Sequence, residues 1–145
     1  MDLPEYITVK EVKRVCKELK ISNWTELKEP KVSAEEAQII LSEVNVEGMD
    51  IKLDEFRSGL EVELEHGTEF NDANVTNNHP IITGKIVLAH LKESLYYYKI
   101  LEVAEIEGDL LKDILEGNVS KIKSRYIKLA NSKMKLCQEE MDQLM

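Results

Sequence analysis

The sequence lacks the features that mark secreted, membrane-spanning or disulfide-stabilised proteins. Its two cysteines, Cys16 and Cys137, lie far apart without CxxC spacing. We expect free thiols in a reducing compartment, with a disulfide between the two ends as the alternative. No apolar run approaches the ~18 residues of a membrane span. The first residues, MDLPEY, show no signal-peptide pattern, so we expect a soluble, cytoplasmic protein that does not bind membranes.

Sequence motifs of the common enzyme classes are also missing. The chain has no GxGxxG, P-loop, HExxH or GxSxG pattern and no glycine-rich loop of any kind. It also shows no strand-like alternation, no internal repeat and no low-complexity tract. These absences favour a non-enzymatic, helical protein. They point to no catalytic residue and leave the question of enzymatic activity open.

Positive charge is outnumbered by negative charge and is unevenly placed. The net charge is −9, which argues against nucleic-acid binding by the chain as a whole. The segment 117–138, however, contains no acidic residue and six bases, so the other residues together carry −15. This basic segment has three possible partners: a phosphate backbone, acids of the protein itself (Asp54, Glu55, Glu61 and Glu65), or solvent alone. The six bases are Lys121, Lys123, Arg125, Lys128, Lys133 and Lys135.

Apolar periodicity predicts an all-α bundle of five or six helices in a single domain, residues 1–145. Thr8 with Glu11, and Ser33 with Glu36, have the spacing of capping boxes, which begin helices. The segment 84–107 is apolar over most of its circumference, so we expect one long helix at the centre of the bundle. The expected helices are 8–20, 34–45, 53–66, 84–107, 109–116 and 119–142, with Gly67 ending the third and Gly108 separating the fourth from the fifth.

Within this domain we distinguish an N-terminal helix and connector (1–32), a core (33–107) and a C-terminal helical extension (108–145). The last helix shows apolar residues at intervals of four, then of four and three alternately, which resembles a heptad seam. A seam of this kind predicts self-association or a protein partner. Its residues are Ile122, Tyr126, Ala130, Met134, Cys137, Met141 and Leu144.

Two of the three histidines lie three residues from a glutamate in predicted helices: Glu63 with His66, and His90 with Glu93. On a helical wheel His90 and Glu93 face the apolar side, and Glu63 borders it. Burying a carboxylate and an imidazole costs several kcal/mol unless they are paired. We therefore predict a polar cluster that fixes how two helices meet, with Glu63 accepting a hydrogen bond from His90 or from Tyr97 or Tyr98.

The same four residues, Glu63, His66, His90 and Glu93, have a second interpretation. Glutamate and histidine three apart on facing helices is how helical bundles hold iron, manganese or zinc. Here the order is reversed in the second pair, and further bridging glutamates are absent. A divalent transition metal is thus the alternative to having no cofactor, and general acid–base catalysis by His90, oriented by Glu93, is a third possibility.

The segments around these residues resemble a known family. ELEHG (63–67), Asn74-Val75-Thr76, TGKI (83–86), LAHL (88–91), Glu93 and Tyr97-Tyr98 are similar to a family of short bacterial, archaeal and phage proteins catalogued only as a domain of unknown function. The resemblance covers about residues 33–107. It implies no activity, but emphasises Glu63, Glu65, His66, Thr83, Lys85, His90, Glu93, Tyr97 and Tyr98.

Three functions follow from these patterns. The first is a non-enzymatic interaction or accessory domain that associates through its C-terminal helix. The second is a metal-binding or hydrolytic protein that uses the Glu/His cluster. The third is a nucleic-acid-associated factor that acts through the basic helix 121–135, which the overall acidity disfavours.

Overall fold

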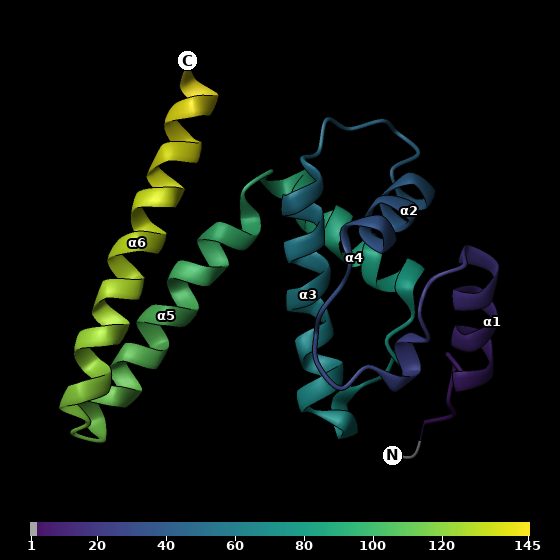
Figure 1. The fold of residues 1–145 in the computed structure, drawn as a ribbon, viewed down its shortest axis with the longest axis horizontal. Coiled ribbons are helices and arrows are strands. Elements are labelled where there is room, and N and C mark those ends of the chain that lie inside the picture. The colour runs from purple at the N-terminus through teal and green to yellow at the C-terminus, as the bar shows by residue number, and fades with distance from the viewer. Residues whose placement is uncertain (1–2) are drawn as a thin grey trace. The chain divides into compact units, whose positions relative to one another are not determined.

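The computed structural model describes residues 3–145, and among these residues there are helices and loops but no strand (Figure 1). The all-α prediction is confirmed, and the six α-helices of the described chain fall within the expected number. No helix in this part of the chain is both long and apolar enough to cross a membrane. The α-helices are α1 (Val9–Leu19), α2 (Ala34–Val44), α3 (Leu53–Glu69), α4 (Pro80–Glu93), α5 (Tyr97–Leu115) and α6 (Val119–Leu144), with short 3-10 helices η1 (Trp24–Glu26) and η2 (Asn71–Ala73).

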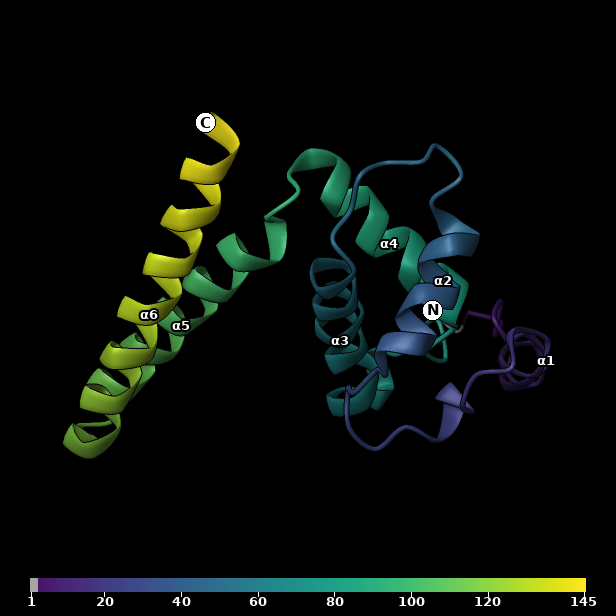
Figure 2. The ribbon, with the colours of Figure 1, turned by 45° about the horizontal axis from the view of Figure 1, so that its top comes forward.

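These helices divide between two compact units, Met1–Leu95 and Tyr96–Met145. The first unit contains α1 to α4 with both 3-10 helices. The second is a hairpin in which α6 runs back along α5, as Figures 1 and 2 both show. The C-terminal extension that the sequence places at 108–145 lies within this hairpin, which begins earlier, at Tyr96.

The predicted helix starts are present, with one difference in their chemistry. Thr8 Oγ1 accepts a hydrogen bond from the backbone N–H of Glu11, and Ser33 Oγ from that of Glu36, each at 3.1 Å. The two glutamate side chains do not complete the box. Glu11 binds Arg14, and Glu36 accepts from the backbone N–H of Ser22 at 2.6 Å. Glu36 therefore ties the connector to α2 instead of capping its own helix.

The core of the first unit is formed where α2, α3 and α4 pack on one another. Phe56 and Leu60 of α3 are fully buried, as is Trp24 of η1. Gly84 of α4 lies at the closest approach to α2, because a Cβ there would stand 2.6 Å from Cγ2 of Ile40. Glycine is therefore required for this helix crossing. The arrangement of these three helices positions the Glu/His residues described below.

The prediction of one long central helix over residues 84–107 is wrong. α4 ends at Glu93 and α5 begins at Tyr97, with Ser94 between them in an extended conformation (φ −157°, ψ 129°). The segment is apolar around most of its circumference because it contains two helices with different apolar faces. Leu88 and Leu91 are buried in the first unit, whereas Ile106 is buried in the second. A single helix of this composition would have to be surrounded by the bundle.

Two predicted breaks at glycine are also wrong. α3 continues through Gly67 to Glu69, and α5 continues through Gly108 to Leu115, so 109–116 is not a separate helix. A Cβ at Gly67 would overlap Oδ1 of Asn78, so this glycine permits a close approach instead of ending a helix. Nothing lies within 4 Å of a Cβ at Gly108. An isolated glycine of this kind costs a helix only about 1 kcal/mol, which neighbouring residues offset.

The hairpin turns at Gly117, whose positive φ of 68° favours glycine, and Asn118 caps α6 by accepting from the backbone N–H of Lys121. Ile122, Leu129 and Leu136 recur every seven residues and form the buried or half-buried side of α6. A spacing of seven residues keeps one side of a helix against its neighbour over several turns. α6 therefore packs on α5 along a line that shares only Ile122 with the predicted seam.

Candidate functional site

The structure brings Glu63 of α3 and His90 of α4 together. Their Oε1 and Nε2 atoms lie 3.6 Å apart, and the side chains are 17% and 31% exposed. Glu93 approaches the other side of the imidazole, with Oε2 4.0 Å from Nδ1. Both distances exceed a direct hydrogen bond of about 3 Å. The contact with Glu63 links α3 to α4, whereas Glu93 and His90 lie three residues apart on α4 itself. The arrangement places a polar contact between α3 and α4.

Two of the predicted site residues, Glu93 and His66, lie exposed at the protein surface. Glu93 does not face the core, since 71% of its side chain is exposed. It lies in the last turn of α4, where the helix leaves the packed region. His66 is exposed near the end of α3 and lines a pocket to which Glu63 also contributes.

A metal site of the predicted kind needs three or four side-chain ligands. Among residues 3–145, no three histidine, cysteine, aspartate or glutamate side chains are grouped so that they could hold a metal ion. Tyr97, the remaining member of the predicted cluster, begins α5 in the second unit. There its ring lies edge-on to that of Tyr98, with centroids 5.2 Å apart.

The pocket lined by Glu63 and His66 is formed by α3, the asparagine-rich loop and the first turns of α4. It encloses about 150 Å³. Asn74 closes it by donating from Nδ2 to the carbonyl of Gly67 and by accepting at Oδ1 from the backbone N–H of Asn78. We call this cavity the Gly67 pocket. Its lining comprises Glu63, His66, Gly67, Ala73, Asn74, Val75, Thr76, Asn78, Thr83 and Ile86.

The loop that closes this pocket is held in place by asparagine side chains. Asn77 and Asn78 both have positive φ, which asparagine tolerates better than most residues. Asn77 Nδ2 donates to the carbonyl of Ile7 at 2.6 Å, and Asn78 Nδ2 donates to that of Trp24 at 3.4 Å. The loop thus connects the N-terminal segment and η1 to the end of α3. The sequence identifies the loop, but its many asparagines do not show which partners they choose.

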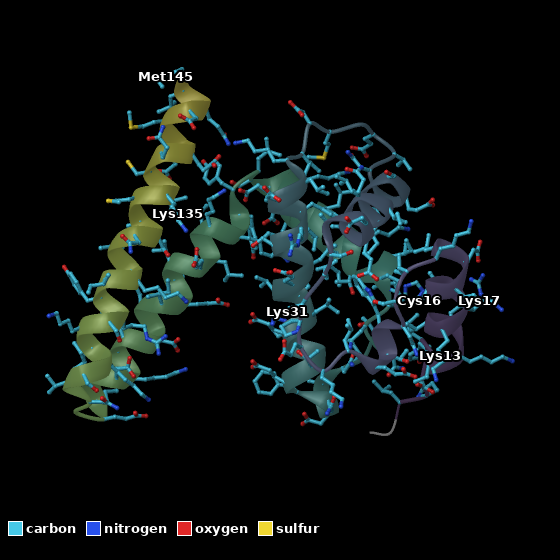
Figure 3. The ribbon with its side chains drawn as sticks, in the orientation of Figure 1. Lys13, Cys16, Lys17, Lys31, Lys135 and Met145 are labelled. Carbon is cyan, nitrogen blue, oxygen red and sulfur yellow. The ribbon has the colours of Figure 1, made fainter. Side chains whose placement is uncertain are left out.

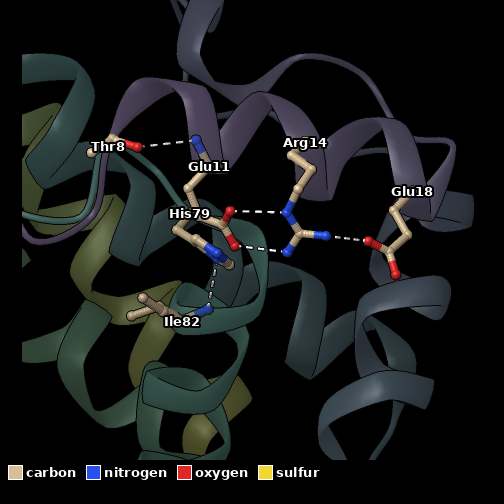
Figure 4. Close-up of polar contacts among 6 residues, drawn as sticks. All are labelled: Thr8, Glu11, Arg14, Glu18, His79 and Ile82. Atoms are coloured by element: carbon tan, nitrogen blue, oxygen red, sulfur yellow. Dashed lines mark hydrogen bonds and ion pairs between the residues drawn. The ribbon is translucent and has the colours of Figure 1, made fainter.

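His79 is the histidine that the sequence did not single out, and it is the most buried of the three. Its Nδ1 accepts from the backbone N–H of Ile82, so it caps α4 directly before Pro80 (Figure 4). Burial lowers the pKa of His79, while the negative charge of Glu11 opposes this shift. The signal was available: a polar residue before a proline at the first helical position is a typical cap.

Glu11 belongs to a chain of charged side chains along α1 (Figure 4). Arg14 donates to Glu11 from Nε and Nη2, at 2.9 and 2.7 Å, and to Glu18 from Nη1. The hydrogen bonds from Arg14 lower the pKa of Glu11. Because these side chains are exposed, the network orders the surface of α1 and contributes little to stability.

The basic patch of α6 is partly neutralised within the hairpin. Arg125 binds Asp113 and Asp109 of α5, each at 3.1 Å, and Lys133 binds Glu107 at 2.6 Å. These acids are not the ones that the sequence names as partners. The other four bases of the patch are exposed: Lys121, Lys123, Lys128 and Lys135.

Much of the predicted seam on α6 faces away from α5. Tyr126, Met134 and Met141 are 64%, 68% and 49% exposed. Figure 3 shows sulfur-bearing side chains of α6 on the side away from α5. Cys137 lies on this stripe as an exposed free thiol, whereas Cys16 is buried in the first unit, which raises the pKa of its thiol. Met134, Lys135, Cys137, Gln138 and Met141 line an open groove of about 480 Å³.

α5 carries a matching stripe. An α-helix turns by about 100° per residue. Because the two helices are antiparallel, both stripes lie on the same side of the hairpin. We call them together the hairpin face. Its members are Ile100, Ala104, Leu111, Ile114 and Leu115 of α5 with Tyr126, Ala130, Met134, Cys137, Met141 and Leu144 of α6, all of them exposed.

Comparison with known proteins identifies a family and no activity. The model of a family described as "Protein of unknown function (DUF5661)" matches residues 12–107, about two thirds of the chain. The match ends where the sequence resemblance ends but begins earlier, within α1. No curated protein and no solved structure matches the chain. Glu63, His90 and the Gly67 pocket lie inside the matched range, whereas α6 lies outside it.

Proposed function

The chain belongs to this family of unknown function, and we propose that it is a non-enzymatic interaction protein that associates with a second copy of itself through the hairpin face. The observation that carries the proposal is the direction of the predicted seam. Heptad-like spacing indicates a helix that packs on another helix. On α6 most of the residues with this spacing are exposed, and a different line of residues packs on α5.

Burial energetics support a partner for this face. Moving one large apolar side chain from water into a packed interface contributes about 1.5–3 kcal/mol. Monomeric proteins expose few contiguous apolar surfaces of more than a few hundred Å². The hairpin face includes long side chains from both helices, among them Leu111, Met134 and Met141. Covering them would supply the driving force for association.

Charge complementarity favours a second copy as the partner. α5 contains five acids and two bases, a net charge of −3, and α6 contains six bases and three acids, a net charge of +3. If two hairpins pack face to face about a twofold axis parallel to their helices, α6 of each copy lies beside α5 of the other. The acidic helix then meets the basic one twice, so the surface is complementary to itself.

Sedimentation velocity on matched variants tests this function. Met134→Glu combined with Met141→Glu places two charges in the hairpin face. We expect this variant to sediment as a monomer under conditions where the unmodified chain is a dimer. The control, Ser124→Glu with Asn131→Glu, adds the same charge to exposed positions of α6 outside the face and should leave the dimer intact. Equal effects of the two double variants would refute a role for the hairpin face.

The two other functions suggested by the sequence have less support. Metal binding by the Glu/His cluster has less support because no three possible side-chain ligands are grouped together within residues 3–145. Nucleic-acid binding would depend on the four exposed lysines of α6, because α5 holds the other two bases of the patch. We therefore advance neither as the principal function.

A further inference from the structure

The exposed sulfur atoms of the protein are concentrated near one end of the chain. Among residues 3–145, every exposed sulfur-containing side chain lies between residues 134 and 145, and Figure 3 shows sulfur atoms along the C-terminal half of α6. These side chains are Met134, Cys137, Met141 and Met145. In the first unit, Cys16 is buried within α1 and Met49 is half-buried in the loop after α2. An oxidant in solution therefore reaches sulfur most easily on α6.

Three of these side chains form one stripe within the hairpin face. Met134, Cys137 and Met141 are separated by three and then four residues, which places them on the same side of an α-helix. They also line the same open groove. Met134 and Met141 are 68% and 49% exposed, so a small solute reaches their side chains while the hairpin face is uncovered.

Oxidation changes the polarity of a methionine side chain. Hydrogen peroxide transfers one oxygen atom to the thioether: an S–O bond forms as the O–O bond breaks, the sulfur loses two electrons, and the peroxide is reduced to water. The sulfoxide is polar, and its formation disrupts methionine-rich interfaces. In the hairpin face, whose members are mainly apolar, a covered sulfoxide oxygen would lose its hydrogen bonds to water without gaining a donor.

We propose that oxidation of Met134 and Met141 by a peroxide prevents the hairpin face from associating with a second copy. This inference rests on the proposed self-association and names how it is regulated. The two thioethers are covered in the dimer and exposed in the free chain, so the peroxide reacts with the free chain. Oxidised chains leave the association equilibrium, and by mass action the remaining dimers dissociate.

Sedimentation velocity before and after peroxide treatment tests this regulation. Both samples are reduced with dithiothreitol afterwards, which reverses disulfides but not methionine sulfoxides. Oxidation of Met134 and Met141, verified by mass spectrometry, should raise the dissociation constant of the dimer at least about tenfold. The matched variant, Met134→Leu with Met141→Leu, keeps Cys137 but has no thioether in the hairpin face. The same treatment should leave the variant's own dissociation constant unchanged, and helical circular dichroism checks that every sample stays folded.

The rate of oxidation gives a second readout. Met134 and Met141 should oxidise more slowly, relative to Met145, at chain concentrations that favour the dimer. Met145 is 92% exposed and follows the end of α6, outside the hairpin face. A monomer at every concentration before treatment would refute the association and its regulation together. A dimer that survives oxidation of both methionines, an equal loss of association in the leucine variant, or no protection of the two methionines in the dimer would overturn the regulation alone.

Discussion

Individual residues in this protein are constrained most strongly where backbone segments approach one another. Gly67 and Gly84 both lie inside helices, where glycine is normally unfavourable. At each position a Cβ would collide with a neighbouring side chain, Asn78 in one case and Ile40 in the other. Glycine destabilises the two helices slightly, but it allows the asparagine-rich loop to pack closely on α3 and α2 to pack closely on α4. Gly108 has no such role, since its surroundings are open.

This contrast gives a matched pair of substitutions. Gly67→Ala should destabilise the fold by about 1–3 kcal/mol, because the methyl group displaces Asn78 and the loop that it holds. Gly108→Ala should stabilise α5 by up to about 1 kcal/mol, because alanine is the better helix former and has room. Urea denaturation of both variants measures the two effects. Similar effects of the same sign would show that the close approach at Gly67 does not limit stability.

A second prediction at this scale concerns pH. Burial lowers the pKa of His79 in the folded state, so protonation favours unfolding. The contribution of neutral His79 is complete above the unfolded pKa of about 6.5 and is lost as the pH falls from there through the folded pKa. His79→Asn keeps a side chain that can cap α4 but cannot titrate. Denaturation at neutral and mildly acidic pH should show a smaller loss of stability in the variant; equal losses would contradict the assignment.

At the scale of the helices, patterns in the sequence predicted which segments are helical better than where each helix ends. The starts at Thr8 and Ser33 are marked by local capping chemistry and are confirmed. The break at Ser94 was missed because the apolar residues of α4 and α5 face different units, and a helical wheel projects them onto one axis. Tertiary contacts decide such a boundary, and they leave no local signal.

The sequence also predicted only part of the candidate site. The spacing of Glu63 and His90 on two helices predicted a polar contact, and the structure brings the two side chains together. The position of Glu93 was misjudged because a wheel does not show where α4 leaves the packed region. The Gly67 pocket could not be foreseen, since it depends on the path of a loop whose asparagines offer many equivalent partners.

Polar contacts between α5 and α6 provide the prediction at this scale. Arg125 reaches Asp113, which is 4% exposed, so Arg125→Met leaves a carboxylate buried without its principal partner. We expect a loss of about 1–3 kcal/mol, measured as faster hydrogen exchange of the α6 amides. Lys133→Met removes an exposed pair with Glu107 and should cost less than about 1 kcal/mol. Indistinguishable exchange in the two variants would argue against a structural role for the Arg125 pair.

At the scale of the whole molecule, the two units differ in how they bury their apolar residues. The first unit contains a packed core, the Glu/His cluster and the Gly67 pocket, and most of the family match falls on it. The second unit is a hairpin whose apolar residues are largely exposed. A two-helix hairpin cannot bury both sides of its helices. We propose that a second copy covers the hairpin face.

Sedimentation equilibrium of the unmodified chain over a range of concentrations tests this association. The chain has a mass of 16.7 kDa, so a self-associating pair has twice that mass. We predict a rise in apparent mass toward the dimer with increasing concentration, and its absence in a chain that ends at Gly117, which lacks α6. A constant mass of one chain at every concentration would contradict the account, as would a dimer that persists after α6 is removed.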